Sequence, residues 1–368
     1  MDPLDLREAI PALDEITYLN TGAASPAPRP VVEAVTDCVK HHEYVAPAAE
    51  GMYPALFAAF DDARETVAEF LGADPDEIAL TRSTADGINR IATALPWQAG
   101  DVVVRTDCEH PAGILPWERL ADRHGVETRV VETIRGRLDR DGLASALDGA
   151  DLLCLSSITW NYGTRLPIAE IVEVAHDAGA RVLVDAVQSP GQTTVDLDAW
   201  GADFVVGAGH KWLLGPWGAG FLYVADDATA ALEPQRVGYR SVADPNDLER
   251  GFAAGARRLE IGTASPAPHA GLAAAIECLD SVGFDTIEGR IERLTDRLKR
   301  SLDDDALLSP REYESGLVTV DVDDPDATVE RLAAEDIRVR SIPSPEAIRV
   351  SVHAFNTAED VDRLLSAL

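Results

Sequence analysis

The sequence predicts an α/β protein built on a large, mostly parallel sheet. Short apolar runs alternate with amphipathic segments along the chain, and 46% of the 368 residues are hydrophobic, enough to fill sizeable cores. Strand and helix alternating on this scale favour a sheet that helices cover on both faces. The expected strands are residues 78–81, 102–105, 127–132, 152–156, 181–185, 204–207 and 221–224.

Helices are expected between these strands, at residues 86–95, 117–124 and 168–178. Together the strands and helices predict a large domain that spans residues 1–255. Its first 30 or so residues are rich in turn-forming glycine and proline and show few strand signals. We expect this N-terminal segment to pack against the second domain.

A smaller α+β domain is expected over residues 256–368. A Gly-rich bridge, residues 251–263, leads into helical segments at 269–282 and 287–302. Residues 317–322 and 348–352 alternate like strands, whereas 327–335 and 358–367 show helical periodicity. The sequence therefore predicts a compact second domain that closes the chain.

The net charge excludes several classes of partner. Against 64 acidic residues stand 32 basic ones, which gives a formal charge of −32. Such a surface repels phosphate backbones and anionic headgroups, so we expect neither nucleic acid nor a membrane as a partner. No run approaches the roughly 18 apolar residues of a membrane span, and the start is acidic where a signal peptide would be basic. We expect a cytoplasmic protein.

Lysine and cysteine are used sparingly. Only Lys40, Lys211 and Lys299 are lysines. Little lysine with so many carboxylates suits molar salt, where the screening length falls to about 3 Å, and favours a halophilic source. The four cysteines show no zinc-binding spacing, and none lies beyond Cys278, so we expect them to be reduced and structural.

Lys211 is the lysine that the sequence singles out. It follows an expected strand and lies in the apolar, Gly-rich segment 207–216, whereas Lys40 and Lys299 have charged neighbours and are expected in solvent. Arginine can replace lysine as a surface cation but does not deprotonate, so it cannot form a Schiff base. A lysine retained here indicates a need for the amine itself, with a loop-closing lysine as the alternative.

Asp185 is the second candidate, because it ends an expected apolar strand. A carboxylate there is costly to bury unless it meets a cation, and a protonated pyridine nitrogen would supply one. Carboxyl ends of parallel strands share one edge of a sheet, so Asp185 and Lys211 are expected at its ligand-binding rim. A helix N-cap is the alternative role for Asp185.

Asp-Ala-Val-Gln at 185–188 and Gly-His-Lys at 209–211 resemble the core of the class V aminotransferases. This pyridoxal-phosphate-dependent family includes cysteine desulfurases and isopenicillin N epimerase-like enzymes. The resemblance runs in order through segments 18–22, 83–89, 109–111, 258–263 and 349–356. It implies the aspartate aminotransferase-like fold, pyridoxal 5′-phosphate as cofactor, and a homodimer with its active site at the subunit interface.

The resemblance implies roles at the cofactor ring. Lys211 would hold the cofactor aldehyde as a Schiff base and then move the substrate α-proton. Asp185 would keep the pyridine nitrogen protonated, which makes the ring an electron sink. Gln188 would hydrogen-bond the phenolic oxygen, and His110 would stack on the ring, with an ordinary surface histidine as the alternative.

Further residues are implied around the phosphate and the substrate. Ser83 and Thr84 precede an expected helix, whose free amides can bind phosphate with their hydroxyls. His210, and Thr263 from the other subunit, would complete the phosphate site. The substrate would meet a carboxylate-binding arginine on a strand of the small domain and the turn that covers it, namely Arg349 with Gly22 and Ala23.

Two positions depart from the family pattern. Ala208 stands where relatives commonly have a serine, so one phosphate hydroxyl is missing. Trp160 stands three residues before Gly163, where relatives place an asparagine, and Asn161 comes one residue late. Either the loop brings Asn161 to the cofactor or Trp160 packs in that place.

The expected function is that of an aminotransferase acting on an amino acid, with a 2-oxo acid as candidate second substrate, because this chemistry needs no group beyond Lys211. A carbon-sulfur lyase and then an epimerase are the alternatives. A cysteine desulfurase of the usual kind is not expected, since residues 340–349 contain no thiol. A Rossmann dehydrogenase is disfavoured because Trp212 replaces the third glycine of its loop. A ligand sensor is the non-enzymatic alternative, and intact Lys211, Asp185, His110 and Arg349 argue against it.

Overall fold

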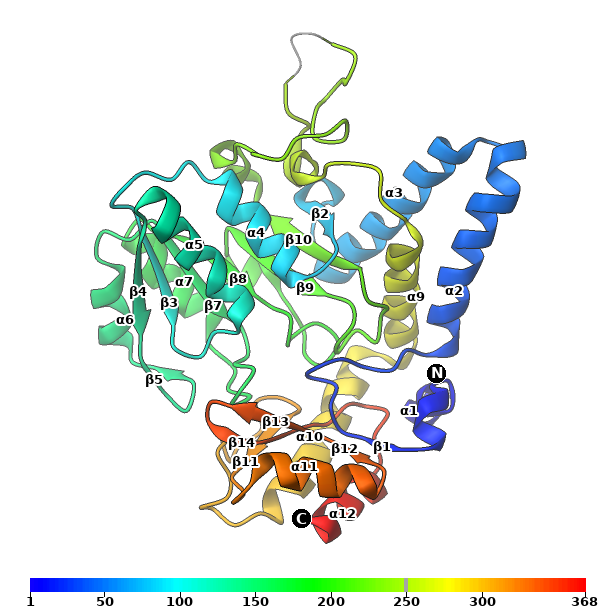
Figure 1. The fold of residues 1–368 in the computed structure, drawn as a ribbon, viewed down its shortest axis with the longest axis vertical. Coiled ribbons are helices and arrows are strands. Elements are labelled where there is room, and N and C mark those ends of the chain that lie inside the picture. The colour runs from blue at the N-terminus through cyan, green and yellow to red at the C-terminus, as the bar shows by residue number, and fades with distance from the viewer. Residues whose placement is uncertain (248–250) are drawn as a thin grey trace.

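The computed structural model describes residues 1–247 and 251–368, and a seven-stranded sheet forms its centre (Figure 1). Five adjacent strands, from β9 to the edge strand β4, pair in parallel, while β10 runs antiparallel to both of its neighbours. All seven strands expected in the large domain are present to within one residue at each end. In spatial order they are β2 (Ile78–Thr81), β10 (Gly220–Val224), β9 (Phe204–Ala208), β8 (Arg181–Asp185), β7 (Leu152–Ser156), β3 (Val102–Thr106) and β4 (Glu127–Val131). The predicted, mostly parallel α/β sheet is confirmed.

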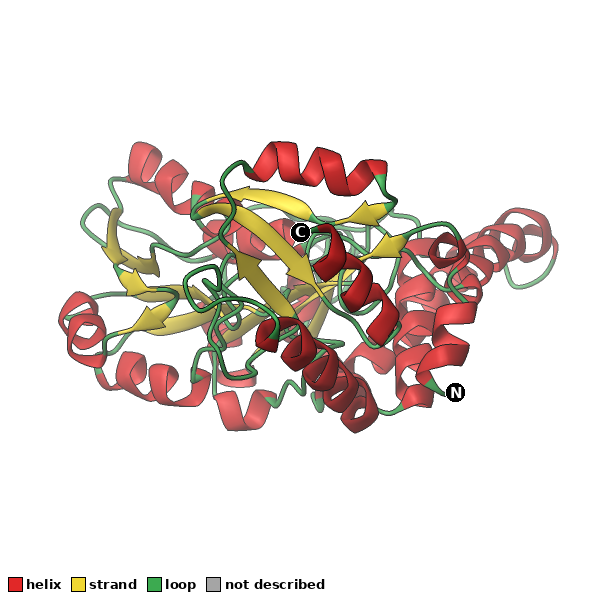
Figure 2. Cartoon of the chain, turned by 90° about the horizontal axis from the view of Figure 1, so that it is seen from below, coloured by secondary structure: helices red, strands yellow, loops and turns green. Residues whose placement is uncertain are grey.

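Helices cover both faces of this sheet, which is why its central strands are buried throughout (Figure 2). Successive strand side chains point to opposite faces, so Val103 and Val104 belong to different cores. One core lies under α4 (Thr84–Ala94) and α5 (Leu115–His124). The other lies under α6 (Arg140–Leu147), α7 (Ile168–Asp177) and α8 (Leu197–Trp200).

The N-terminal segment contacts the C-terminal part of the chain. It forms α1 (Pro3–Glu8) and β1 (Thr17–Tyr18), and β1 pairs in parallel with β12 (Ile337–Arg338). Arg7 forms an ion pair with Asp360, 2.9 Å apart. The following α2 (Arg29–Lys40) and α3 (Met52–Leu71) were not expected. Proline signalled turns there, but Pro30 lies in the first turn of α2, where no backbone N–H is needed.

The C-terminal part begins with α9 (Ala267–Val282) and α10 (Phe284–Arg300). It continues as an antiparallel sheet in the order β11 (Leu317–Val320), β14 (Glu346–Ser351) and β13 (Arg340–Pro343), with α11 (Pro325–Ala334) and α12 (Ala358–Ala367). The short hairpin β5 (Thr133–Ile134) and β6 (Arg137–Leu138) completes the described strands. The domain boundary at residue 255 stays a prediction.

The expectation that Lys299 lies in solvent is wrong. Its side chain, on α10, is 2% exposed, and its Nζ donates a hydrogen bond to the carbonyl oxygen of Glu312, 2.8 Å away. The segment before β11 folds back over this helix and covers the ammonium group. Burial lowers the pKa of Lys299 to about 8.

None of the helices in residues 1–247 and 251–368 combines the length and apolar character that crossing a membrane requires.

Candidate active site

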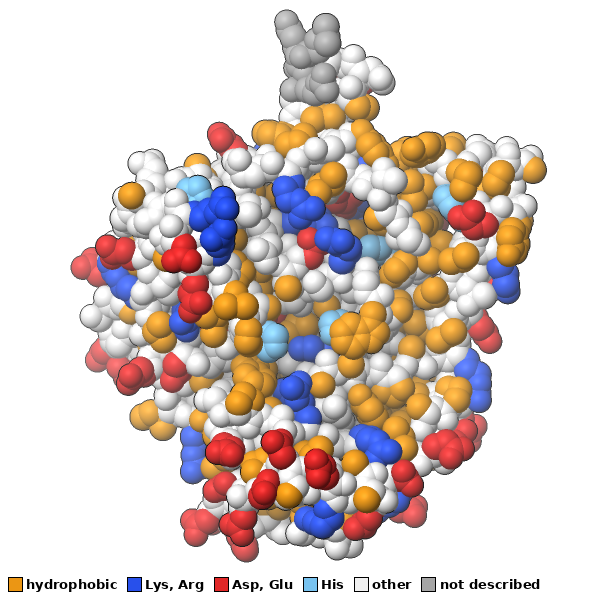
Figure 3. All heavy atoms as spheres, in the orientation of Figure 1, with side chains coloured by type: hydrophobic (Ala, Val, Ile, Leu, Met, Phe, Trp, Pro, Cys, Tyr) orange, Lys and Arg blue, Asp and Glu red, His pale blue; other side chains and the backbone are white. Residues whose placement is uncertain are grey.

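A cavity of about 310 Å³ opens at the carboxyl ends of the parallel strands. Figure 3 shows histidine and basic side chains gathered at a hollow in this face of the molecule. Ten of the twelve predicted site residues line the cavity. The ten are Gly22, Ala23, Ser83, Thr84, His110, Asp185, Gln188, His210, Lys211 and Arg349.

The sheet explains why residues far apart in sequence meet here. Asp185 is the last residue of β8, and Lys211 follows three residues after the end of β9. Thr84 opens the helix that follows β2, and His110 comes shortly after β3. Ligands of open α/β sheets bind at this edge, beyond the carboxyl ends of the strands.

Asp185 and Lys211 carry the titratable groups at the cavity floor. Asp185 is 3% exposed, and the only hydrogen bond that described residues give its carboxylate runs from the Val187 N–H to Oδ1, at 3.0 Å. Burial raises the pKa of Asp185, and nearby Lys211 opposes this shift. Burial lowers the pKa of Lys211 to about 8, with Asp185 acting in the opposite direction. The cavity thus holds an amine that loses its proton easily and a carboxylate with one free oxygen.

The start of α4 offers donors for an anion. The Ser83 Oγ caps the helix by accepting from the N–H of Asp86 at 3.2 Å, which leaves its own O–H free to donate. The Oγ1 of Thr84 is buried without a hydrogen-bond partner among the described residues. The first amides of a helix also lack partners and attract negative charge. A phosphate group suits this end of the cavity.

His210 and Trp217 form the wall beside it. Their rings stack with centroids 4.1 Å apart and planes at 19°. Burial and the charge of Lys211 lower the pKa of His210 to about 4, so this imidazole is neutral at pH 7. Ala208, the last residue of β9, is buried and supplies no hydroxyl. Among His210, Trp217 and Ala208, it is therefore His210 that offers this wall of the cavity a polar side chain.

His110 is held as a neutral ring at the cavity rim. Its Nδ1 accepts a hydrogen bond from the N–H of Ala112 at 3.2 Å, so Nε2 carries the proton of the neutral form. Partial burial, with the charges of Lys211, Arg340 and Arg349, lowers the pKa of His110 to about 4. The ring is therefore suited to packing rather than to carrying charge.

Arg349 is buried with unused donors. It is 1% exposed, and its Nη1 donates to the carbonyl oxygen of Trp160 at 2.7 Å, while Nε and Nη2 have no partner among the described residues. A Cβ at Gly22 would lie 3.1 Å from Nη2 and 2.6 Å from a Leu317 methyl, so this turn has room only for glycine. A planar fork with two free N–H groups fits a carboxylate.

Arg340 also lines the cavity, and the sequence analysis missed it. It lies directly opposite Arg349 in the β13–β14 register. Within residues 1–247 and 251–368, neither guanidinium forms an ion pair with a carboxylate; each donates a hydrogen bond to a backbone carbonyl oxygen. The sequence does contain a pattern that predicts the position of Arg340. A two-residue turn at 344–345 between alternating strands places residues 340 and 349 opposite each other.

Trp160, not Asn161, lines the cavity. The indole of Trp160 packs edge-on against His110, with ring centroids 5.7 Å apart. Asn161 is hydrogen-bonded to the C-terminal sheet instead. Its side-chain Nδ2 donates to the carbonyl oxygen of Ser344 at 3.0 Å, and its backbone carbonyl oxygen accepts from the Thr319 hydroxyl. The expectation that Asn161 lies at the cofactor is not supported by this placement.

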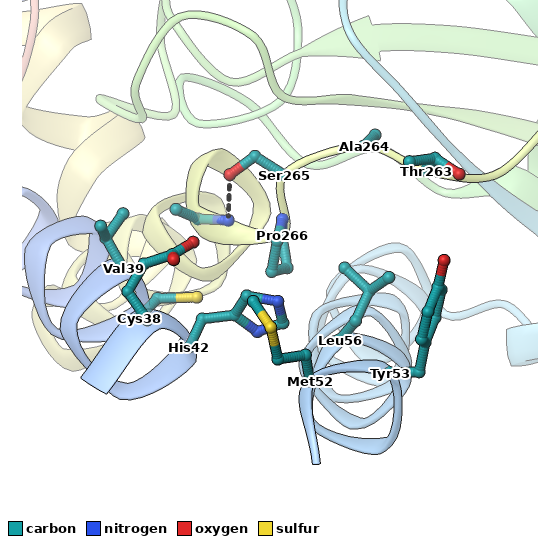
Figure 4. A pocket seen from close by; sticks show the side chains of 12 residues that line it. Cys38, Val39, His42, Met52, Tyr53, Leu56, Thr263, Ala264, Ser265 and Pro266 are labelled. Carbon is teal, nitrogen blue, oxygen red and sulfur yellow. Dashed lines mark hydrogen bonds between the residues drawn. The ribbon is translucent and has the colours of Figure 1, made fainter. Parts of the chain in front are cut away.

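Thr263 is the other predicted residue outside the cavity. It lines a separate pocket of about 470 Å³ between α2 and α3, together with Cys38, His42 and Met52 (Figure 4). Its N–H donates to the hydroxyl oxygen of Tyr239 at 2.8 Å, and its φ is +42°. Thr263 therefore does not line the Lys211 cavity of its own chain.

Comparison with known proteins gives the family. Residues 17–364 match the family model "Aminotransferase class-V". The chain is 34% identical to a probable cysteine desulfurase of Methanothermobacter thermautotrophicus, over 98% of this chain and 96% of that protein. It is 32% identical to isopenicillin N epimerase of Streptomyces clavuligerus, over 96% and 94% of the two chains.

Solved structures agree with this assignment. The cystine C-S lyase C-DES, in complex with its reaction product cysteine persulfide, has a TM-score of 0.91 and 30% identity over 97% of this chain and 98% of that one. A C-DES mutant with glycine covalently linked to its PLP cofactor has a TM-score of 0.93 and 30% identity over 98% of each chain. Both the match over nearly the whole length and the common fold lead to one conclusion: the chain belongs to the class V aminotransferase family of pyridoxal 5′-phosphate enzymes.

Proposed function

We propose that this protein is a carbon-sulfur lyase that removes a sulfur substituent from Cβ of an amino acid, with a disulfide such as cystine as the substrate. The sequence favoured an aminotransferase, with the lyase as an alternative. The similarity to desulfurases and to a cystine C-S lyase supports the alternative. The observation that carries the proposal is a cavity whose described lining residues include two guanidinium groups with no carboxylate partner among residues 1–247 and 251–368, and include no cysteine.

The described side chains fit the cofactor. The buried Thr84 hydroxyl and the start of α4 would hold the phosphate, and the free oxygen of Asp185 would meet the pyridine nitrogen. Lys211 would attach the aldehyde, because an amine with a pKa of about 8 is partly neutral at pH 7. His110 and Gln188 would lie against the ring and its phenolic oxygen.

The four cysteines support elimination without a protein thiol. Burial raises the pKa of Cys108 to about 11 and raises the pKa of Cys154 well above its ordinary value. Cys278 lies on α9, and Cys38 lines the separate pocket in Figure 4. A thiol whose pKa is raised carries little thiolate, the form that attacks sulfur. Sulfur would therefore leave with the substrate fragment and would not be transferred to the protein.

Bound pyridoxal phosphate supplies an electron sink for charge at Cα. Lys211 would take the Cα proton, and Arg349 would hold the α-carboxylate so that the Cα–H bond faces this amine. The Cβ–S bond then breaks with its electron pair on sulfur. For cystine the leaving group, once protonated, is cysteine persulfide, and addition of water to the remaining three-carbon enamine gives pyruvate and ammonia.

Arg340 supports a substrate with a second anionic group. The side chains of Arg340 and Arg349 start from paired positions on adjacent strands and both reach the cavity. Two neighbouring guanidinium groups repel unless anions lie between them, and they lower the pKa of Lys211 as well. A cystine-type substrate carries one carboxylate for each.

Product analysis tests the proposed reaction. With L-cystine, and with no 2-oxo acid added as a second substrate, the holoenzyme is expected to form pyruvate, ammonia and cysteine persulfide in equal amounts. Amino-group transfer to an added 2-oxo acid would show an aminotransferase. Alanine from L-cysteine would show a desulfurase, and loss of optical activity without cleavage would show an epimerase; each of these three results contradicts the proposal.

We also propose that the enzyme works as a homodimer, with Thr263 of one chain completing the phosphate site of the other. Support comes from the position of Thr263 outside its own cavity and from exposed apolar residues near it, among them Tyr53 and Met52. Sedimentation of active holoenzyme in molar KCl is expected to give the mass of two chains. A monomeric mass with full activity would contradict this expectation.

A further inference from the structure

The side chain of Gln188 is held at both ends. The indole N–H of Trp212 donates to Gln188 Oε1 at 2.7 Å, and Gln188 Nε2 donates to the carbonyl oxygen of Gly22 at 3.1 Å. An indole nitrogen can only donate, so the end of the carboxamide that faces Trp212 must be its oxygen. The NH₂ end is thereby directed toward Gly22, which itself lines the cavity.

This orientation leaves one N–H group of the Gln188 carboxamide free to donate. The NH₂ group has two hydrogens, and the Gly22 carbonyl accepts one. Gln188 lines the cavity, so the second N–H is available to an acceptor there. If the carboxamide turned by 180°, its oxygen would face the Gly22 carbonyl and would repel any oxyanion in the cavity.

Trp212 is itself fixed on several sides. Its carbonyl oxygen accepts from His353 Nε2 at 2.9 Å, and its ring lies 5.9 Å from that imidazole at 22°. A Cβ at Gly191 would come within 2.3 Å of the Trp212 carbonyl oxygen, and one at Gly316 within 2.9 Å of the indole Cη2. The indole is fully buried and has no room to turn away from Gln188.

We infer that Trp212 is a positioning residue that keeps Gln188 oriented as a hydrogen-bond donor toward the phenolic oxygen of bound pyridoxal phosphate. This inference rests on the proposed place of Gln188 at the cofactor. Because Trp212 directly follows Lys211, the same residue fixes the donor and the chain beside the reactive amine.

Removing only the indole N–H tests the inference. Trp212→Phe keeps an aromatic ring but frees the carboxamide to turn. A donor stabilises the anionic form of the phenolic oxygen, so its loss should raise the pH midpoint of the visible absorption of the holoenzyme by about one unit. Trp117→Phe changes another fully buried indole, on α5 and outside the cavity wall, and should leave the midpoint unchanged.

A double-mutant cycle shows whether Trp212 acts through Gln188. Gln188→Ala alone is expected to raise the midpoint similarly, and adding Trp212→Phe to it should cause no further shift. Additive shifts, or no shift with Trp212→Phe, would overturn the inference. Should Trp212→Phe fail to fold, β-(3-benzothienyl)alanine at position 212 preserves the indole shape without its N–H and is expected to give the same shift. All spectra are recorded without substrate, so the result is independent of the reaction catalysed.

Discussion

Lys211→Ala is expected to abolish covalent attachment of pyridoxal phosphate and to lower turnover by at least about 10³-fold, as removal of both a nucleophile and a general base should. No other lysine can substitute, because Nζ of the buried Lys299 donates a hydrogen bond to the carbonyl oxygen of Glu312 and Lys40 is paired with Asp37 on the surface. Borohydride reduction followed by mass spectrometry of the peptides locates the attachment. In the parent enzyme the added mass should fall on the peptide that contains Lys211.

Lys40→Ala is the matched control for this experiment. It removes an exposed lysine on α2 and should change neither the attachment nor the turnover. A reducible adduct that persists in Lys211→Ala would show that a different amine holds the cofactor.

Arg349→Ala is expected to raise KM by about 10- to 100-fold, the range for losing a charge-assisted, two-point contact to a carboxylate. The visible spectrum should stay intact, because the Arg349 guanidinium is assigned to the substrate and not to the cofactor. Steady-state kinetics and a spectrum of each preparation check the two halves of this prediction. Unchanged KM would reject the assignment.

Arg340→Ala provides the comparison that separates the two guanidinium groups. It should raise KM for L-cystine but not for S-methyl-L-cysteine, which lacks the second carboxylate. Arg349→Ala should raise KM for both substrates. Equal effects of Arg340→Ala on the two substrates would argue against a second carboxylate site.

The sheet and the floor of the site follow from the sequence because both depend on local signals. The central strands β8 and β9 are largely apolar runs; Asp185 ends the first and Lys211 follows the second, so topology alone brings them together. Parallel strands need helices on both faces, which fixed the class of fold.

Other features depend on tertiary contacts that no local pattern records. Proline near residue 30 indicated turns, yet the first turn of α2 accommodates it. Lys299 has charged neighbours in sequence, but the chain folds over it. Asn161 was one residue out of place for the cofactor, and only the contact with Ser344 shows where its carboxamide goes.

The central claim is that carbon-sulfur cleavage occurs at the Lys211 cavity without help from a protein thiol. Turnover of L-cystine by a variant with Cys38→Ser, Cys108→Ala, Cys154→Ala and Cys278→Ala tests it most directly, once an unchanged cofactor spectrum shows that the variant binds pyridoxal phosphate. We predict pyruvate and cysteine persulfide at the rate of the parent enzyme. Loss of both products in the spectrally intact variant, with recovery when a single cysteine is restored, would contradict the account.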